Sequence, residues 1–355
     1  MNTVKSEIDC LLFVSFGGPE GPDDVIPFLE NVLRGKPVPR DRLLEVAEHY
    51  QHFGGVSPIN AQNRDIIARL SDALQAAGNP LPIYWGNRNW QPFITDALRE
   101  IDQAGHRLAL PIFTSMYSSY SGCRQYRENI ALSLQELGDR APQVAPRLRF
   151  GFNHPKYIAA QIDLARQAYE NLPSSHRQQA RLLVTAHSIP LSMADNCSYV
   201  QQLKESSRLV AQALNVPWDM VYQSRSGPPS QPWLEPDIGE HLRQLSAQGV
   251  QACVVLPMGF VSDHMEVMYD LDTEAKQLCD ELGILYSRAP AVGTHPDFIS
   301  MLVDLIDERC QQRTIKQCVG SLPPLHDFCP ENCCLYPQGP RSQTQGATHG
   351  PQVKN

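Results

Sequence analysis

The sequence has no long apolar run, no cluster of basic residues and no clear processing signal. No stretch reaches the roughly 18 apolar residues that a membrane-spanning helix needs. Lys and Arg number 30 against 38 Asp and Glu, a formal charge of -8, whereas nucleic-acid binding depends on clustered positive charge. The first apolar stretch breaks at Gly17 and Gly18 and carries no cleavage site. We therefore expect a cytoplasmic protein with no transmembrane segment that binds no nucleic acid.

Nucleotide-binding fingerprints are also missing. The turn GPEGP after the first apolar run lacks the spacing of a dinucleotide-binding or P-loop motif. The 10 cysteines of a cytoplasmic chain favour thiols or metal ligands over a disulfide framework. Cys10, Cys253 and Cys279 lie in apolar runs and are expected in the core, where free cysteine packs like a small hydrophobe.

Short apolar runs alternate with longer amphipathic stretches along most of the chain. Helical patterns such as those of residues 60–77 and 154–171 lie between the runs, and this alternation predicts an α/β fold with parallel sheets flanked by helices. The expected strands are nearly continuous apolar runs, as buried parallel strands should be. They are CLLFVSF, LPIYWGN, RLALPIFT, RLRFGFN, ARLLVTAHS, DMVYQSR, QACVVLPMGF and ILYSRAP.

The two halves of the chain resemble each other. Four expected strands precede residue 155 and four follow it, and the third of each half leads into a polar loop. Either an internal duplication or the general similarity of α/β units explains this. We predict an N-terminal domain of residues 1–154, a C-terminal domain of residues 155–310, and a Cys-containing tail of residues 311–355 whose polar end is disordered. Loops at the carboxyl ends of the strands would then surround one cleft.

The motif TAHSIP places His187 at the end of an expected strand, where folds of this class carry functional groups. An imidazole titrates near neutral pH and can accept a proton there. A structural histidine that is satisfied by hydrogen bonds fits the same position, so position alone leaves both interpretations open.

An acidic row follows the seventh expected strand, in GFVSDHMEVMYDLDTEA. Glu266, Asp270 and Glu274 are spaced four residues apart, which on a helix places them along one face. A solvent-exposed face would normally include Lys or Arg, and none occurs before Lys276. Oxygen ligands suit a hydrated divalent cation, so the row is a candidate metal path. The alternative is an acidic first helical turn, which explains Glu266 better than the two later carboxylates.

A weaker signal is the segment FGGVSPINAQNR. Its glycines permit close backbone approach, and Ser57 precedes an expected helix from about Asn60, where it can donate to an anionic group. A purely structural turn accounts for the same residues.

Taken together, these motifs resemble those of the ferrochelatase family. FGGPEGP, HFGGVSPIN, GNRNWQPF, YSSYSGCRQY, TAHSIP, QSRSGPPSQPWLEP and GFVSDHMEVMYDLD occur in the family's order, from Phe16 to Asp272. In their detailed sequence these motifs resemble the actinobacterial type of the family, whose substrate is coproporphyrin III. The resemblance implies two Rossmann-like, chelatase-type domains of four parallel strands each, with a porphyrin cleft between them and Fe²⁺ as a substrate of haem biosynthesis.

The resemblance also implies roles for the acidic row and the histidine. His187 and Glu266 are expected to flank the macrocycle, meeting from opposite halves of the molecule across a slot of tetrapyrrole size, and to bind or hand over the metal. Which of them accepts the proton stays open. Asp270 and Glu274 match the family's acidic row.

Four further residues are implied to contact the porphyrin. Ser57 and Tyr126 match residues that hold the ring and its propionates, and Arg34 stands where the family has a basic residue at the mouth of the cleft. Some relatives carry an axial tyrosine after the first strand. Phe16 stands there and cannot ligate iron, and Ser15 is the nearest polar substitute.

Many ferrochelatases bind a [2Fe–2S] cluster through three tail cysteines and one from the body. By this resemblance the ligands are Cys123, Cys329, Cys333 and Cys334, with Cys318 as a substitute because adjacent cysteines do not readily both ligate. Free thiols or a zinc site are the alternatives.

Three other functions remain open from the sequence. A protoporphyrin IX ferrochelatase and a cobalt or nickel tetrapyrrole chelatase would use similar groups, and a haem or porphyrin carrier would need no metal path. Besides porphyrin and iron, we expect only transient contact with neighbouring haem-pathway enzymes.

Overall fold

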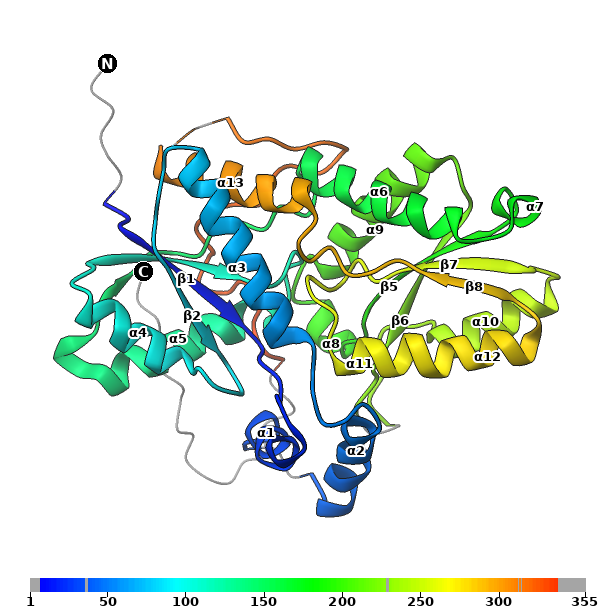
Figure 1. The fold of residues 1–355 in the computed structure, drawn as a ribbon, viewed down its shortest axis with the longest axis horizontal. Helices are drawn as coiled ribbons and strands as arrows, with labels where there is room; N and C mark the ends of the chain where they lie inside the picture. The colour runs from blue at the N-terminus through cyan, green and yellow to red at the C-terminus, as the bar shows by residue number, and fades with distance from the viewer. Residues whose placement is uncertain (1–6, 36–37, 228–229, 312, 314, 338–355) are drawn as a thin grey trace.

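Two four-stranded parallel sheets lie side by side (Figure 1). The computed structural model describes residues 7–35, 38–227, 230–311, 313 and 315–337. The strand orders are β2-β1-β3-β4 and β6-β5-β7-β8, so the predicted α/β fold with two parallel sheets is confirmed. The strands are β1 Cys10–Ser15, β2 Ile83–Asn87, β3 Leu108–Phe113, β4 Gln143–Val144, β5 Arg181–His187, β6 Trp218–Gln223, β7 Ala252–Leu256 and β8 Leu285–Arg288.

Helices cover both faces of each sheet because successive residues of a strand point to opposite faces. On β1, Leu11 and Phe13 pack toward α3, whereas Leu12 and Val14 pack toward α4 and α5. The helices of the first half are α1 Val25–Val32, α2 Arg40–His52, α3 Ile59–Ala76, α4 Ile94–Gln103 and α5 Gln125–Leu137. The α1–α2 pair lies below the sheets in Figure 1.

The second half has more helical segments, several of them short. They are α6 Pro155–Glu170, α7 Ser174–Arg177, α8 Leu191–Ala194, α9 Tyr199–Leu214, α10 Ile238–Ala247, α11 Met265–Val267, α12 Lys276–Leu282 and α13 Pro296–Cys310. Within the described part of the chain, none of the helices has the length and apolarity to cross a bilayer.

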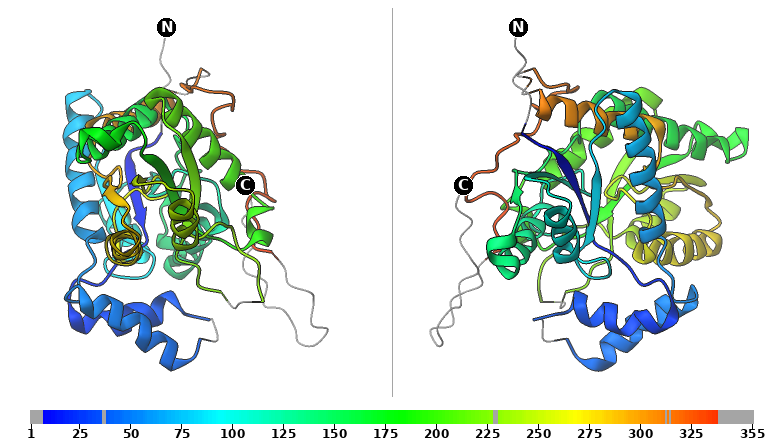
Figure 2. Two further views of the ribbon diagram at one scale, coloured as in Figure 1. Left: turned by 90° about the vertical axis from the view of Figure 1, so that its right-hand side faces the viewer. Right: turned by 60° about the vertical axis from the view of Figure 1, so that its left-hand side comes forward.

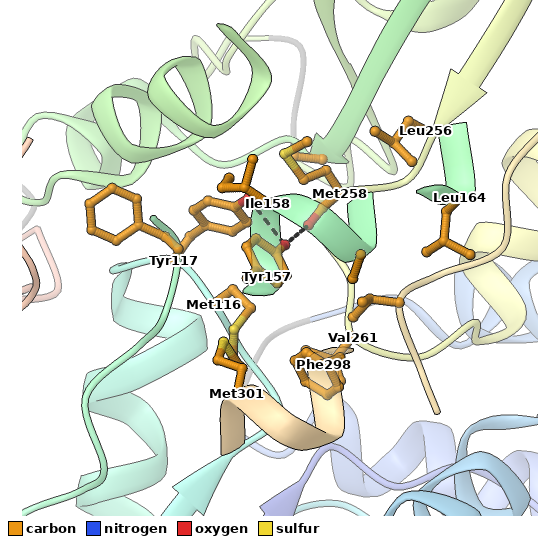
Figure 3. Packing of buried hydrophobic residues seen from close by; sticks show 14 of the residues in the cluster. Met116, Tyr117, Tyr157, Ile158, Leu164, Leu256, Met258, Val261, Phe298 and Met301 are labelled. Atoms are coloured by element: carbon orange, nitrogen blue, oxygen red, sulfur yellow. Dashed lines mark hydrogen bonds between the residues drawn. The ribbon is translucent and has the colours of Figure 1, made fainter. Parts of the chain in front are cut away.

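One hydrophobic core runs through both halves. It joins Leu11 and Phe13 of the first sheet to Leu182 and Val184 of the second. At its centre the Tyr157 hydroxyl lies 3.2 Å from that of Tyr117 and donates to the Met258 carbonyl at 3.1 Å (Figure 3). The two sheets are therefore held in a fixed relation by shared packing.

The halves repeat each other in topology. Each sheet places its first strand between its second and third, and a parallel bridge follows the second strand in both, Asn87 with Phe93 and Tyr222 with Asp237. This agrees with the similarity seen in the sequence.

The fourth strand was predicted at the wrong place. RLRFGFN, residues 147–153, forms no strand, and β4 is the shorter Gln143–Val144. Beyond β4 the Ala145 and Leu148 amides still bond to β3 carbonyls, but Pro146 between them has no amide hydrogen to donate. The apolar run is buried, yet it belongs to no ladder.

The last helix and the tail cross between the halves. Helix α13 packs against both α3 and α6, and the segment after it returns along the first half (Figure 2). There Val319 donates its amide to Asn153, and Arg124 bonds to the Glu331 and Cys333 carbonyls. The domain boundaries stay a prediction, and the predicted disorder of the polar end falls mostly on residues 338–355, outside the described residues.

His154 gives the fold a pH-dependent stability. It caps α6 and is fully buried, and burial, with the nearby charge of Arg149, lowers its pKa to about 4. The unfolded chain binds a proton near pH 6.5, so stability is full above that value and is lost as pH falls toward 4. On going from pH 7 to 4.5 we expect the free energy of unfolding to fall by about 2–3 kcal/mol more than in His154→Asn, which keeps a cap. Urea titrations at the two pH values measure this, and equal losses would contradict it.

Candidate active site

His187 ends β5, at the carboxyl edge of the second sheet. Its carbonyl accepts a hydrogen bond from the Tyr199 hydroxyl at 3.1 Å, and its Nδ1 bonds to the Ser188 carbonyl. A carbonyl only accepts, so Nδ1 carries a proton. The other ring nitrogen, Nε2, is directed at Glu266, with 3.5 Å between Nε2 and Oε2.

Close packing of a loop brings Glu266 to the histidine. The loop leaves β7 through Gly259, whose amide donates to the Thr185 carbonyl at 3.0 Å. A Cβ on Gly259 would lie 2.6 Å from the Ala186 Cα, a separation that no side chain tolerates. Glycine therefore lets the loop lie against β5 beside His187, and α11 then begins with Met265 and Glu266.

This geometry corrects the expectation that the two groups face each other across a slot. Both belong to the second half, His187 at the end of β5 and Glu266 in α11, and His187 Nε2 and Glu266 Oε2 are too close to admit a macrocycle between them. A tetrapyrrole would have to lie against the pair, which would then act from one side of the ring.

The first half also reaches this site. The Gln62 side chain of α3 accepts from the Asp263 amide at 2.8 Å, and Ser262 donates to Asn63. Met265 packs into the cluster formed by α1 and α2. The segment FGGVSPINAQNR and the segment GFVSDH therefore lie together, although about 200 residues separate them.

The acidic row lies on the helical segment expected after β7, but that segment is not a continuous α-helix. Glu266 lies in α11, and Asp270 and Glu274 lie in a π-helix, Met268–Ala275, that continues into α12. π-Helical turns are rare and occur frequently at functional sites. The charges of Glu266 and Glu274 both act on Asp270, so the three carboxylates lie near one another; Glu266 and Glu274 are exposed, and Asp270 between them is half-buried.

Burial and like charge set the protonation of the site. Burial, followed by the charges of Glu266 and Glu274, raises the pKa of Asp270 to about 7, against hydrogen bonds from Ser224 and Gln223. For His187, burial lowers the pKa, but the hydrogen bond and charge of Glu266 outweigh it, and the net shift is upward.

Two neighbouring groups differ in their freedom to bind metal. Burial lowers the pKa of half-buried His264, which keeps its imidazole neutral at physiological pH. Asp263 is paired with Arg288 at 2.9 Å. Asp263 is therefore already held in an ion pair, whereas His264 forms no ion pair among the described residues and is the more accessible metal ligand of the two.

The residues expected to hold the porphyrin lie in different surroundings. Ser57 is buried against Gly18, whose Cβ position would lie 2.9 Å from the serine hydroxyl. Arg34 is exposed just after α1 and donates to Asn31 at 2.6 Å. Tyr126 is buried against Phe113, and burial raises its pKa to about 12. Their roles stay predictions.

Ser15 is fully buried in a polar network. Its hydroxyl bonds to Asn87 and accepts from Asn63 at 2.8 Å and from Trp85 at 3.3 Å. These three hydrogen bonds use the whole bonding capacity of the hydroxyl in this conformation. A substrate role for Ser15 would require one of them to break, and it stays a prediction.

Ser224 is a candidate residue that the sequence did not single out. It follows β6 with φ of 60°, a left-handed conformation that is strained for a serine, and its hydroxyl bonds to Asp270. The only signal was its place in the motif QSRSGPP. The partner, 46 residues away, could not be read from the sequence.

Four of the five candidate cysteines come together at the tail. Cys329 lies within hydrogen-bond range of Cys123 and Cys333, and the Cys333 and Cys334 sulfurs are 3.5 Å apart. Cys334 has φ of 53°, a left-handed conformation that non-glycine residues seldom adopt. Cys318 is exposed, with no recorded contact to the four within the described residues.

Arg147 supplies positive charge to this group. Its guanidinium is buried and donates to the Cys123 sulfur at 3.1 Å and the Cys329 sulfur at 3.4 Å. Its third hydrogen bond goes to the Leu148 carbonyl at 3.0 Å, and the described residues place no carboxylate in an ion pair with it. Hydrogen bonds from neighbouring thiols, with Arg147, lower the pKa of Cys329. A buried guanidinium without a carboxylate favours anionic sulfur beside it.

The two matching four-stranded parallel sheets define a chelatase-type fold. A solved structure titled SirB from Bacillus subtilis with Fe3+ shares that fold, with a TM-score of 0.52 at 13% identity over 85% of this chain and 96% of that one.

The chain belongs to the ferrochelatase family, whose model matches residues 9–310. A relative from Rhodopirellula baltica, named ferrochelatase, is 58% identical over 92% of this chain and 93% of its own length. One from Streptomyces griseus, named coproporphyrin III ferrochelatase, is 48% identical over 96% of each chain. The protein is thus an enzyme of the lyase class, with porphyrin metallation as its chemistry.

Proposed function

We propose that the protein inserts Fe²⁺ into coproporphyrin III, as a cytoplasmic step of haem biosynthesis. The contact between His187 and Glu266, backed by half-buried Asp270, is the observation that carries the proposal. Family membership supplies iron as the metal, and the name of the Streptomyces griseus relative favours this porphyrin. The Rhodopirellula baltica relative is named without its porphyrin, so protoporphyrin IX is the competing substrate.

Metal insertion removes two protons from pyrrole nitrogens as one Fe²⁺ enters. Since Nδ1 is held by the Ser188 carbonyl, Nε2 of neutral His187 is the nitrogen that accepts a proton. Glu266 then stabilises the imidazolium, which agrees with the raised pKa of the histidine. The second pyrrole proton passes to water, and Asp270, with a pKa of about 7, gives its own proton to water and binds iron as a carboxylate. The row from Glu274 inward supplies oxygen ligands to iron.

A spectral assay tests the substrate directly. Purified enzyme is mixed anaerobically with Fe²⁺ and either coproporphyrin III or protoporphyrin IX, and then with Co²⁺ or Ni²⁺ in place of iron. We expect turnover to be fastest with Fe²⁺ and coproporphyrin III. Faster turnover of protoporphyrin IX, or of the other metals, would overturn that part of the proposal, and binding without turnover would indicate a carrier.

Asp270→Asn is expected to weaken iron use selectively. Asparagine can keep hydrogen bonds to Ser224 but cannot supply a charge, so the KM for Fe²⁺ should rise about tenfold, equivalent to 1.4 kcal/mol. The KM for porphyrin should not change. In the wild type, iron use should improve as pH rises through about 7, where Asp270 ionises, and the variant should lack this dependence.

The matched control for this variant is Glu281→Gln. Glu281 is an exposed carboxylate farther along the same helical segment and bonds only to Gln277 in the recorded contacts. If both variants shift the iron KM equally, the effect is one of general surface charge and the metal path is wrong.

We also propose that Cys123, Cys329, Cys333 and Cys334 hold a [2Fe–2S] cluster. Four sulfurs in a linked set fit the four thiolates that such a cluster needs, and Arg147 fits their charge. A bound cluster exchanges single electrons. The residues themselves fasten the tail to the loop at Cys123. Zinc is the competing occupant, because atoms of His326, Cys329 and Cys333 lie within 4.8 Å of one another.

Cys329→Ser should remove the cluster. Wild-type protein purified without oxygen should be brown and contain iron and acid-labile sulfide, and the variant should lose both. Cys318→Ser is the matched control and should keep them, because Cys318 is exposed and apart from the four. A colourless wild type that holds one zinc would contradict the cluster assignment.

A further inference from the structure

A cavity of about 230 Å³ lies beside the cysteines, away from the His187 site. Strand β3, helix α5 and the segment from β4 onward form most of it, and residues 327–329 of the tail close one side. Most of its lining is apolar, including Phe113, Ile130, Leu134 and Val144. The cavity does not lie between the two halves, because all of its lining residues belong to the first half and the tail.

The cavity is distinct from the space between the four sulfurs. Of the four cysteines only Cys329 contributes to its lining. Filling the cysteine site with metal would therefore leave the cavity in place.

One nitrogen atom of a positive group in the lining lacks a hydrogen-bond partner. The Nη1 atom of Arg127 is buried and has no hydrogen-bond partner within the described residues. A buried donor left unpaired costs about 1–3 kcal/mol, and more when it is charged. The other charged groups are engaged: Arg147 with the cysteines, and Asp327 with Lys316.

The charges select the kind of ligand. A carboxylate in the cavity would supply the hydrogen-bond partner that the Nη1 atom of Arg127 lacks. A doubly charged phosphate would meet Asp327 and the sulfurs, whereas a single negative charge meets less repulsion. An apolar cavity of roughly 150 Å³ takes up benzene, so this one has room for an apolar body of roughly six to eight carbons.

We propose that this cavity binds a small apolar monocarboxylate, with its carboxylate on Arg127 and its hydrocarbon part against α5 and β3. The site is separate from the one for porphyrin and iron. Its occupant would also contact Cys329 and Arg147, so binding would change the surroundings of the cysteine site.

Calorimetry with octanoate tests the proposal on the full-length protein as purified, with coproporphyrin III present to occupy the porphyrin site. We expect saturable one-to-one binding, and at least tenfold weaker binding of octanamide, which has the same shape without the charge. Arg127→Gln should weaken octanoate at least tenfold and bring it close to octanamide. No saturable binding in the millimolar range would overturn the proposal.

Two matched pairs of variants separate the cavity from the rest of the surface. Arg140→Gln removes an exposed charge outside the cavity, and Leu132→Phe enlarges an exposed residue on α5; both should bind octanoate like the wild type. Ala131→Phe fills the cavity from the same helix and should abolish binding even if Arg127→Gln fails to fold. Unchanged binding in Ala131→Phe would place octanoate elsewhere and overturn the assignment.

Discussion

His187→Ala is expected to lose iron insertion while it keeps most of its affinity for porphyrin. Alanine removes the nitrogen that accepts the pyrrole proton, and the loss of a positioned general base typically lowers kcat by roughly 10²–10⁴-fold. The imidazole lies at the end of β5 and only partly within the core, so its removal should leave the fold intact. Fluorescence quenching of the free porphyrin measures binding, and formation of the metalloporphyrin measures insertion.

The matched control is His176→Ala in the short helix α7, where the imidazole contacts only Ser175 in the recorded hydrogen bonds. This variant should insert iron like the wild type. A further check is pH: wild-type activity should rise as His187 becomes neutral, and because Glu266 raises the pKa of that imidazole, the rise should come at a higher pH than for an ordinary histidine. Near-normal insertion by His187→Ala would remove the proposed base from the mechanism.

The strands and long helices could be predicted because their signals are local. A buried parallel strand needs a continuous apolar run, and β1, β5 and β7 lie inside such runs. Helices α3 and α6 begin and end within a residue or so of their amphipathic patterns. The misplaced β4 shows the limit: an apolar run reports burial, and a single proline beside it decides whether the ladder continues.

The candidate site could be predicted in its residues but not in its arrangement. The motifs singled out His187, Glu266 and Asp270. The direct contact between His187 and Glu266 depends on the close approach of Gly259 to β5, which is a tertiary feature that the sequence does not show. The residues of the π-helix are ones that an α-helix also accepts, so the spacing of the carboxylates in the sequence did not distinguish the two kinds of helix. Ser224 is read as a partner of Asp270 only when β6 and the helix are placed together.

Buried charge was the feature least visible in the sequence. RLRFGFN reads as an apolar strand, but its Arg149 is a charged residue in the interior, with its side chain only 1% exposed. Its partner Glu308, on α13, is 159 residues away and 6% exposed. The two form a bidentate pair with distances of 2.8 and 2.9 Å. Gln317 of the tail also bonds to both, so this pair links the first half, the last helix and the tail.

Glu308→Gln should therefore be strongly destabilising. Glutamine keeps the shape but leaves a buried guanidinium without its counter-charge, and breaking one partner of a buried pair costs about 3–5 kcal/mol. Thermal melting and urea unfolding measure the loss. Glu45→Gln is the matched control, because Glu45 forms an exposed pair with Arg42 at 2.6 Å, and such pairs contribute about 0–1 kcal/mol.

A double variant separates the cost of the unpaired charge from the loss of packing. In Glu308→Gln with Arg149→Met, no charge is left buried, so we expect part of the stability lost in Glu308→Gln to return. If the double variant is instead less stable than the single one by the full cost of a second core substitution, the pair does not act as a unit. The junction of α13 and the tail would then be held by its apolar contacts, and Arg149 would not need Glu308 to remain buried.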